Sequence, residues 1–413
     1  MSGHLPIFIL EQRREKLLSD LLAESTTERR LERLMDAARS RKPAEPGLRV
    51  EANEVPGCMS KVWLRSTWRA GRCWFEWEAE SLVVASITGL LSDLYSGARP
   101  AEILACDPGF LRKAGITAHL TANRRNALSR IGSRIRDFAA SCRDRQFYDA
   151  HNHLQDDRFA GRQDELVAAA VDVGVGSMVV NGSCESDWPA VAELARRYPG
   201  IVIPSFGYHP WYIHERTERW IDTLKRLLDE QPNAVIGEIG LDRWKPGLSY
   251  DGQEQVFHTQ LSLAAERNLP VSVHCLQAWG RMLEILTDSP RPPRGVVLHS
   301  YGGSTELVKP LAELGAYFSF PGYFAHERKD RQRGTFRHVP EDRILIETDA
   351  PDQLPPAALI THPLAESLNH PANLAAIYGS AAVTVGKSIE SLAARVADNF
   401  RRVFEAAPAQ SVQ

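Results

Sequence analysis

The stretch "QFYDAHNHLQDD" at residues 146–157 decides the fold of this chain. It begins as a short apolar strand and ends in two histidines, His151 and His153, that are separated by one residue. Such a strand is typical of the start of a metal-binding β/α barrel, in which all strand ends meet at one mouth. A His-x-His pair alone is a weak signal, so the interpretation depends on the strands that follow.

Short β-branched or aromatic runs alternate with amphipathic segments of helical length from residue 146 onward. The predicted strands span 146–151, 176–182, 201–207, 234–240, 270–275, 295–300, 315–320 and 343–350. Several helical segments end in Gly, Pro or Asn before the next strand, as helix C-termini do. Eight βα units over roughly 260 residues predict a closed (β/α)₈ TIM-type barrel. A doubly wound open sheet is the alternative, because a sequence does not show closure.

Side chains that bind metals stand at the ends of five predicted strands. They are His151 and His153, Glu238, His274, His299 and Asp349, with His209 as a further candidate after the third strand. We expect them to converge at the barrel mouth, where they could bind one or two ions of the Zn, Mn, Co or Mg type. A carboxylate such as Glu238 can bridge two ions about 3.5–4 Å apart. Taken singly, Glu238 could cap a helix and His209 could be a buried imidazole, but the repetition at strand ends favours a metal site.

Residues 1–145 show a different pattern, which predicts a small α+β domain with its boundary at 145 and the barrel over 146–413. A charged helical segment at 9–41 leads into a breaker-rich loop at 41–47. The predicted hairpin strands span 61–68 and 73–80, and further helical segments span 81–95, 100–113 and 122–140.

Composition is ordinary for a soluble globular protein, with 43% hydrophobic and 24% charged residues. No apolar run approaches the ~20 residues of a membrane span, and the first residues do not resemble a signal peptide. The six cysteines are scattered without a CxxC pair, which favours free thiols in a reducing cytosol. We therefore expect a cytoplasmic protein without membrane contact.

The charges are divided unevenly along the chain. Residues 1–145 carry 24 basic and 18 acidic side chains, a balance of +6, and the remainder carries 25 and 34, a balance of −9. An acidic barrel does not suit a sequence-independent grip on nucleic acid, which depends on Lys and Arg. Any polyanionic substrate therefore has to be met by local basic residues or by metal ions.

Six successive motifs of the barrel half resemble the TatD family of metal-dependent hydrolases over residues 147–405. They are "DAHNHL" (149–154), "GYHP" (207–210), "VIGEIGLD" (235–242), "PVSVHC" (270–275), "LHSYGGS" (298–304) and "LIETDAP" (345–351). The resemblance implies a barrel with two divalent ions that hydrolyses phosphodiesters, typically as a deoxyribonuclease.

Carried over residue by residue, the resemblance implies two sets of metal ligands that share one carboxylate. The first set is His151, His153, Glu238 and Asp349, and the second is Glu238, His274 and His299. An activated water would attack phosphorus and Asp349 would accept its proton. Two positions depart from the family: Leu276 stands where an arginine is usual, and "NHP" (369–371) replaces "NEP". The missing arginine argues against DNA as the substrate more than it argues against hydrolysis.

The stretch "VPGCMSKVWL" at 55–64 presents Cys58 in a Pro-Gly turn directly before a predicted strand. A partly buried, unreactive thiol is the common explanation, and the basic balance of this half permits a reactive one. Together with 82–104 and 118–131, the stretch resembles the SufE family. That resemblance implies that Cys58 accepts sulfane sulfur as a persulfide from a SufS-type cysteine desulfurase, for iron–sulfur cluster assembly. Arg124 falls on the arginine of a family motif, and the exchange needs no metal.

The sequence thus predicts a metal-dependent phosphodiesterase, of the TatD deoxyribonuclease type, fused to a sulfur acceptor. One alternative is a barrel that hydrolyses a non-nucleic-acid ester or amide. Another is a sulfur-transfer protein whose barrel serves as a docking body. Fold alone does not decide among them.

Overall fold

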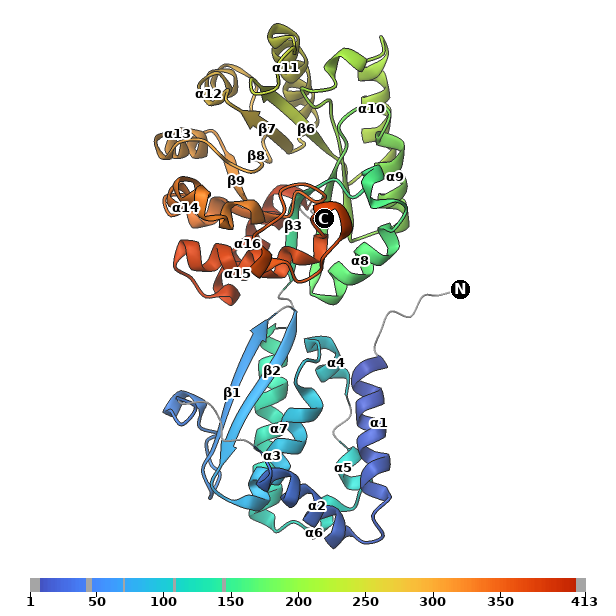
Figure 1. The fold of residues 1–413 in the computed structure, drawn as a ribbon, viewed down its shortest axis with the longest axis vertical. Helices are drawn as coiled ribbons and strands as arrows, with labels where there is room; N and C mark the ends of the chain where they lie inside the picture. Colours follow the sequence, from blue (N-terminus) through green and yellow to red (C-terminus); the bar gives the residue numbers. More distant parts are fainter. Residues whose placement is uncertain (1–7, 42–46, 70, 107–108, 143–145, 406–413) are drawn as a thin grey trace, which may run out of the picture. The chain divides into compact units, whose positions relative to one another are not determined.

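The computed structural model of the chain describes residues 8–41, 47–69, 71–106, 109–142 and 146–405. The chain forms two compact units, residues 1–144 and 145–413, each of which is described by itself (Figure 1). The predicted boundary at 145 and most of the predicted loop at 41–47 lie outside the described residues.

Unit 1 consists of helices and one antiparallel hairpin, which confirms the predicted α+β architecture. The hairpin strands are β1 (Val62–Arg69) and β2 (Arg72–Ala79), with Val62 opposite Ala79. The helices are α1 (Phe8–Leu22), α2 (Thr27–Arg39), α3 (Leu82–Tyr95), α4 (Pro100–Ala105), α5 (Phe110–Lys113), α6 (Ile116–His119) and α7 (Ala122–Cys142). Helix α3 is buried along most of its length, and α7 buries a stripe of residues spaced about one turn apart. These two helices form the core with the hairpin.

The single helical segment predicted at 9–41 is two helices in the structure. Thr26 ends the connection in an extended conformation, and its side-chain oxygen accepts a hydrogen bond from the backbone N–H of Arg29. This is an N-cap, which begins a new helix by satisfying an otherwise unpaired backbone donor. The periodicity of charged residues does not show this interruption.

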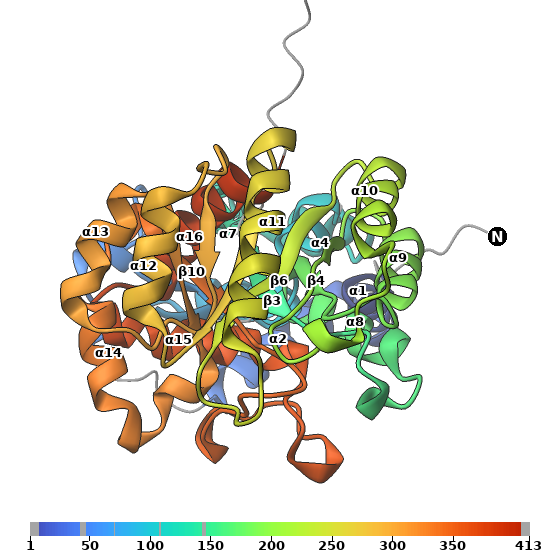
Figure 2. The same ribbon diagram turned by 90° about the horizontal axis from the view of Figure 1, so that it is seen from above.

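Unit 2 is a nearly closed barrel of eight parallel strands (Figures 1 and 2). They are β3 (Phe147–Asn152), β4 (Val175–Asn181), β5 (Val202–Phe206), β6 (Val235–Asp242), β7 (Val271–Leu276), β8 (Val296–Leu298), β9 (Ala316–Pro321) and β10 (Ile344–Glu347). Each strand pairs with the next one along the chain, without the reversal that a doubly wound sheet requires. The predicted (β/α)₈ barrel is therefore confirmed, and the open-sheet alternative is wrong.

The seam between β3 and the end of β10 is closed by backbone hydrogen bonds and by one buried carboxylate. The N–H of Asp349 donates to His151 O at 2.9 Å, and the N–H of His153 donates to Ala350 O at 2.7 Å. The carboxylate of Asp149, which is fully buried in β3, accepts both the backbone N–H and the hydroxyl of Thr348. The first and last strands thereby hold their metal-competent residues beside each other.

Helices surround the strands of unit 2 (Figure 2). They are α8 (Gln163–Asp172), α9 (Trp188–Arg197), α10 (Trp220–Glu230), α11 (Tyr250–Arg267), α12 (Trp279–Asp288), α13 (Val308–Glu313), α14 (Asp330–Phe336), α15 (Leu374–Val385) and α16 (Ile389–Phe404). Helices α15 and α16 both pack on β3 and β10, across the seam. Among the described residues, none of the helices is long and apolar enough to cross a membrane.

Candidate functional site

The predicted metal-competent side chains come together at the carboxyl ends of the unit 2 strands. His151, Glu238 and His274 lie within β3, β6 and β7, and His153, His209, His299 and Asp349 lie one to three residues beyond β3, β5, β8 and β10. His153 is half-buried and the other six are buried. Three overlapping groups of these residues bring their donor atoms close enough to hold a cation.

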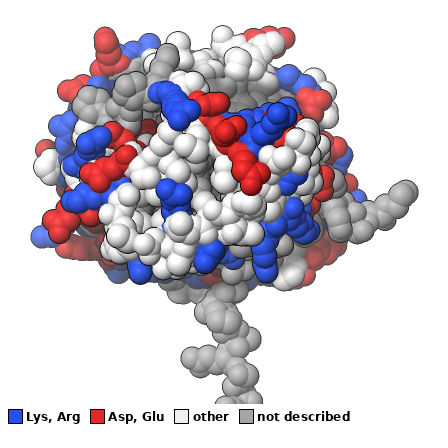
Figure 3. All heavy atoms as spheres, turned by 90° about the horizontal axis from the view of Figure 1, so that it is seen from below, with Lys and Arg blue, Asp and Glu red and all other residues white. Residues whose placement is uncertain are grey.

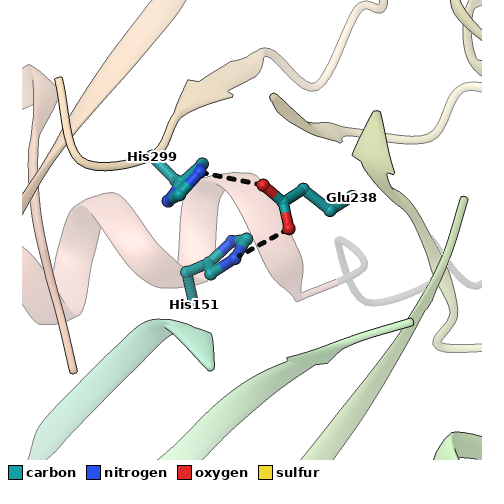
Figure 4. Close-up of side chains that lie close together, drawn as sticks. All are labelled: His151, Glu238 and His299. Atoms are coloured by element: carbon teal, nitrogen blue, oxygen red, sulfur yellow. Dashed lines mark ion pairs between the residues drawn. The ribbon is translucent and has the colours of Figure 1, made fainter. Parts of the chain in front are cut away.

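Glu238 lies at the centre of the cluster, and its two carboxylate oxygens face different histidines. Oε2 lies 3.6 Å from His151 Nε2 and 3.3 Å from His153 Nε2. Oε1 lies 2.9 Å from His299 Nε2 and 3.1 Å from His274 Nδ1. Figure 4 shows His151 and His299 reaching opposite oxygens of this carboxylate. A carboxylate placed in this way can bridge two cations.

The donors on the Oε2 side have the spacing of one ligand shell. The Nε2 atoms of His151 and His153 are 3.3 Å apart, and they lie 3.7 and 3.6 Å from Asp349 Oδ1. Ligand atoms held at about 2.0–2.2 Å from an ion in a tetrahedral arrangement lie about 3.3–3.6 Å from one another. His151, His153 and Asp349, with Glu238 Oε2 beside both histidines, therefore fit a divalent ion.

The donors on the Oε1 side form a second, purely histidine group around the same carboxylate. His274 Nδ1 and His299 Nε2 are 3.2 Å apart, and His209 Nε2 lies 3.5 Å from Glu238 Oε1. The spacing is again that of ligands around one cation. The donor set thus fits two ions, and His209 stands close enough to Glu238 either to join the second group or to face a substrate.

Hydrogen bonds from outside the cluster orient the histidine rings. His153 Nδ1 lies 2.7 Å from Asn181 O and donates to it, and His274 Nε2 lies 3.0 Å from Asp242 Oδ2. A ring that donates through one nitrogen presents the lone pair of its other nitrogen to a metal. The sequence-based prediction missed both residues. Asp242 stands at a strand end, where the same rule could have found it, whereas Asn181 acts through its backbone oxygen, which no side-chain type indicates.

Burial and mutual charge shift the acidity of the whole cluster. Burial alone would raise the pKa of Glu238, but the surrounding histidines hold it well below its usual range. Burial would lower the pKa of His153, but the Glu238 carboxylate raises it to about 9. Burial lowers the pKa of His209 well below its ordinary value. Glu238 is therefore ionised, and its negative charge is available to a cation.

A neighbouring side chain holds Asp349, and a buried carboxylate faces His299. Asp349 has a left-handed backbone conformation with a φ of 52°, and its Oδ2 accepts a hydrogen bond from Gln353 Nε2 at 2.7 Å, which leaves Oδ1 facing His151. Glu347 Oε1 lies 3.7 Å from His299 Nδ1. Aspartate is one of the few non-glycine residues that adopt this backbone conformation readily.

A glycine lets β6 approach β7 closely beside the histidine of that strand. Gly240 has a φ of 141°, and a Cβ there would lie 2.0 Å from the backbone oxygen of His274. No larger residue fits without moving one strand. The spacing of Glu238 and His274 across the two strands therefore depends on Gly240.

Leu276 ends β7 with 39% of its surface exposed, so the mouth has an apolar side chain where the family arginine is usual. His370, at the second departure from the family, is buried and its Nδ1 accepts the N–H of Ala372 at 2.9 Å. Burial lowers the pKa of His370 to about 4, helped by the nearby His362. His370 caps a turn, and it does not belong to the three groups of metal-competent residues.

In unit 1, Cys58 lies in the loop before β1 and is partly exposed, whereas the other five cysteines of the chain are buried. Burial raises the pKa of its thiol, and the positive charge of Arg130 lowers it. Arg130 Nη1 donates to Pro56 O at 3.2 Å, and its guanidinium occupies the space that a Cβ at Gly57 would need. The sequence analysis did not predict Arg130. Its effect on the pKa of Cys58 arises because α7 packs on this loop.

Arg124 is the third residue of α7. The neighbouring Asn123 Nδ2 lies 2.8 Å from Met59 Sδ, one residue after Cys58.

Figure 3 views the end of unit 1 at which α2 and α6 lie in Figure 1. Basic and acidic side chains alternate there around an uncharged area, so this face carries both signs of charge.

Comparisons with known proteins agree with both units. Residues 148–405 match the family model of TatD related DNases, and residues 15–139 match that of the SufE Fe-S metabolism associated domain. The chain is 31% identical over 261 residues to the 3'-5' ssDNA/RNA exonuclease TatD of Pantoea vagans, covering 63% of this chain and 100% of that protein. It is 33% identical over 259 residues to the protein of the same name from Erwinia tasmaniensis, covering 62% and 99%.

Two solved structures share the fold of unit 2. A TatD homologue from Escherichia coli K12 aligns with a TM-score of 0.58 at 24% identity, covering 63% of this chain and 98% of that one. A TatD family hydrolase from Entamoeba histolytica aligns with a TM-score of 0.57 at 20% identity, covering 64% and 99%. The chain belongs to the family of TatD related DNases and carries a SufE domain ahead of its TatD domain.

Proposed function

We propose that the barrel domain, residues 146–413, is a divalent-metal-dependent phosphodiesterase that acts on DNA or another phosphodiester. The observation that carries the proposal is Glu238, whose two oxygens face two separate groups of metal ligands. The relatives named as 3'-5' ssDNA/RNA exonucleases favour a nucleic-acid substrate over a carboxylic ester or an amide.

Two ions of the Mg, Mn, Zn or Co type would supply charge stabilisation of the phosphoryl oxygens and a more acidic water. The chain's own residues set the geometry for this chemistry. Glu238 fixes the distance between the two ligand groups, and Asp242 and Asn181 fix the histidine rings. Asp349, in contact with the His151 group, is placed to accept the proton of the attacking water. His209 lies beside Glu238 Oε1, where it can contact the substrate.

The test is hydrolysis of a labelled single-stranded oligonucleotide by purified protein with and without added divalent ions. We expect metal-dependent hydrolysis that Glu238→Ala abolishes and that Glu193→Ala, an exposed glutamate on the outer helix α9, leaves unchanged. Bound metal without cleavage of any phosphodiester would reject the proposal. Cleavage of a carboxylic ester or an amide under the same conditions would then favour that alternative.

We propose further that residues 1–145 form a sulfur acceptor domain with Cys58 as the acceptor. The Cys58 thiolate would attack the outer sulfur of a persulfide on a cysteine desulfurase. The sulfur–sulfur bond on the donor breaks as the new one on Cys58 forms, and the donor cysteine leaves as a thiolate. The partial exposure of Cys58 and the adjacent Arg130 charge support this role.

Mass spectrometry after incubation with a SufS-type desulfurase and cysteine tests this second function. We expect a mass gain of one sulfur atom on Cys58, its loss in Cys58→Ser, and no change in Cys184→Ser, which removes a buried thiol of the barrel. A Cys58→Ser protein that still gained sulfur would reject the assignment. Persulfide formation in a chain that hydrolyses nothing would favour the barrel as a docking body.

A further inference from the structure

The loop that follows β6 is fixed to the metal centre through Asp242. Oδ1 of Asp242 accepts the backbone N–H groups of Trp244 and Lys245 at 2.7 and 2.9 Å. Oδ2 accepts the indole N–H of Trp211 at 2.7 Å and lies 3.0 Å from His274 Nε2. One carboxylate thus orients a metal-competent histidine and holds the loop in register with it.

Three residues with side chains suited to nucleic acid follow Asp242. Arg243 and Lys245 are cations stacked on aromatic rings, and Trp244 between them is exposed. The Arg243 guanidinium carbon lies 3.8 Å from the centroid of the Tyr250 ring, and Lys245 Nζ lies 4.3 Å from that of Trp211. Trp244, between them, is 59% exposed. The exposed indole offers an aromatic face on which a planar group can stack, and a cation stacked on a ring can still donate N–H groups to an anion.

This loop borders the position at which the family arginine is absent. In the pairing of β6 with β7, Asp242 lies opposite Leu276, and the N–H of Arg243 donates to Leu276 O at 2.9 Å. The barrel half has a charge balance of −9, so a polyanion needs local cations. Arg243, the first residue after β6, supplies a cation beside the end of β7 that lacks one.

We propose that Arg243, Trp244 and Lys245 form a binding site for single-stranded nucleic acid, in which a base stacks on Trp244 and a phosphate contacts Arg243. The site borders Leu276 at the end of β7. It rests on the proposed phosphodiesterase function and specifies its substrate. Stacking on an indole is open to every base of a single strand, whereas duplex bases keep their faces stacked on each other.

The test compares hydrolysis of oligothymidine with that of bis(p-nitrophenyl) phosphate, a diester without bases, in the metal-loaded protein. We expect Trp244→Ala to raise the KM for the oligonucleotide about tenfold, and so to lower the ratio of the two kcat/KM values by the same factor. Arg243→Gln should lower the slope of log KM against log salt concentration by about one, and Arg243→Lys should restore it. Arg196→Gln removes the same charge from the last turn of α9 and serves as the control.

The possible results separate this inference from the proposed function. Hydrolysis of oligothymidine with wild-type KM and salt slope in both loop variants would overturn the binding site and leave the phosphodiesterase intact. Absence of hydrolysis in the wild type would reject the phosphodiesterase. Anisotropy of labelled oligothymidine, measured with the metal removed, then still tests the site: binding weakened by Trp244→Ala supports it, and equal binding overturns it.

Discussion

Replacing Asp242 by asparagine tests how the second ligand group is built. The substitution keeps the shape of the side chain and one oxygen, which can still accept the backbone N–H groups of Trp244 and Lys245. It places an NH₂ group where Asp242 Oδ2 now receives His274 Nε2–H and the Trp211 indole N–H. Because two donors then face the amide, His274 is driven to carry its proton on Nδ1, the nitrogen that faces Glu238.

A proton on His274 Nδ1 blocks the lone pair that a cation on the Oε1 side of Glu238 would use. Loss of such an orienting partner typically costs 10–100-fold in metal affinity, or about 1.4–2.8 kcal/mol. The His151 group on the other side makes no contact with Asp242, so the affinity of the first ion should stay unchanged.

Competition between the protein and a fluorescent chelator for Zn²⁺ measures both affinities. We expect one of the two dissociation constants to rise 10–100-fold in Asp242→Asn. Asp352→Asn, which alters an exposed carboxylate paired with Arg158, should leave both at the wild-type value. Two unchanged constants in Asp242→Asn would refute the assigned histidine orientation, as would an equal loss at both sites.

Three further results are expected. Gly240→Ala should lower the free energy of unfolding, measured in urea, by about 2–5 kcal/mol. The added Cβ would meet the backbone oxygen of His274, and the φ of this residue is positive. An unchanged free energy of unfolding would contradict this and show that β6 and β7 can move apart. Burial raises the pKa of the Cys58 thiol, so its alkylation rate should still climb above pH 9, and a plateau below pH 8 would contradict this. His370 has a pKa of about 4 when folded against 6.5 when unfolded, so the unfolded state takes up the proton first and stability should fall by about 3 kcal/mol from pH 6.5 to 4. His370→Asn, which keeps the cap acceptor, should lose about 3 kcal/mol less than the wild type over this pH range, and an equal loss in both proteins would contradict the assignment.

The sequence predicts the barrel and the convergence of its metal-competent side chains because one geometric rule connects distant residues. Parallel strands of a barrel end at the same mouth, so Glu238 and Asp349 converge although more than one hundred residues separate them. Alternation of strands and helices predicted eight βα units but left an open sheet as an alternative, and the sequential pairing of β3 to β10 decides for the barrel.

Side-chain orientation and contacts between helices and loops lie beyond such rules. Arg130 acts on Cys58 because α7 packs against the loop before β1, a tertiary contact without a sequence spacing of its own. The break at Thr26 depends on one hydroxyl hydrogen bond rather than on periodicity. The stacking of Arg243 on Tyr250 depends on the path of the loop after β6. The sequence therefore shows that Leu276 replaces an arginine, but it does not show that Arg243 lies beside it.

Titration of metal-free protein with Mn²⁺, followed by hydrolysis of a single-stranded oligonucleotide, tests whether the barrel is a two-metal phosphodiesterase. We expect two ions bound per chain, hydrolysis that requires both, and the loss of both hydrolysis and the second ion in Glu238→Ala. Full hydrolysis by the metal-free chain would contradict this proposal, as would an undiminished rate in Glu238→Ala.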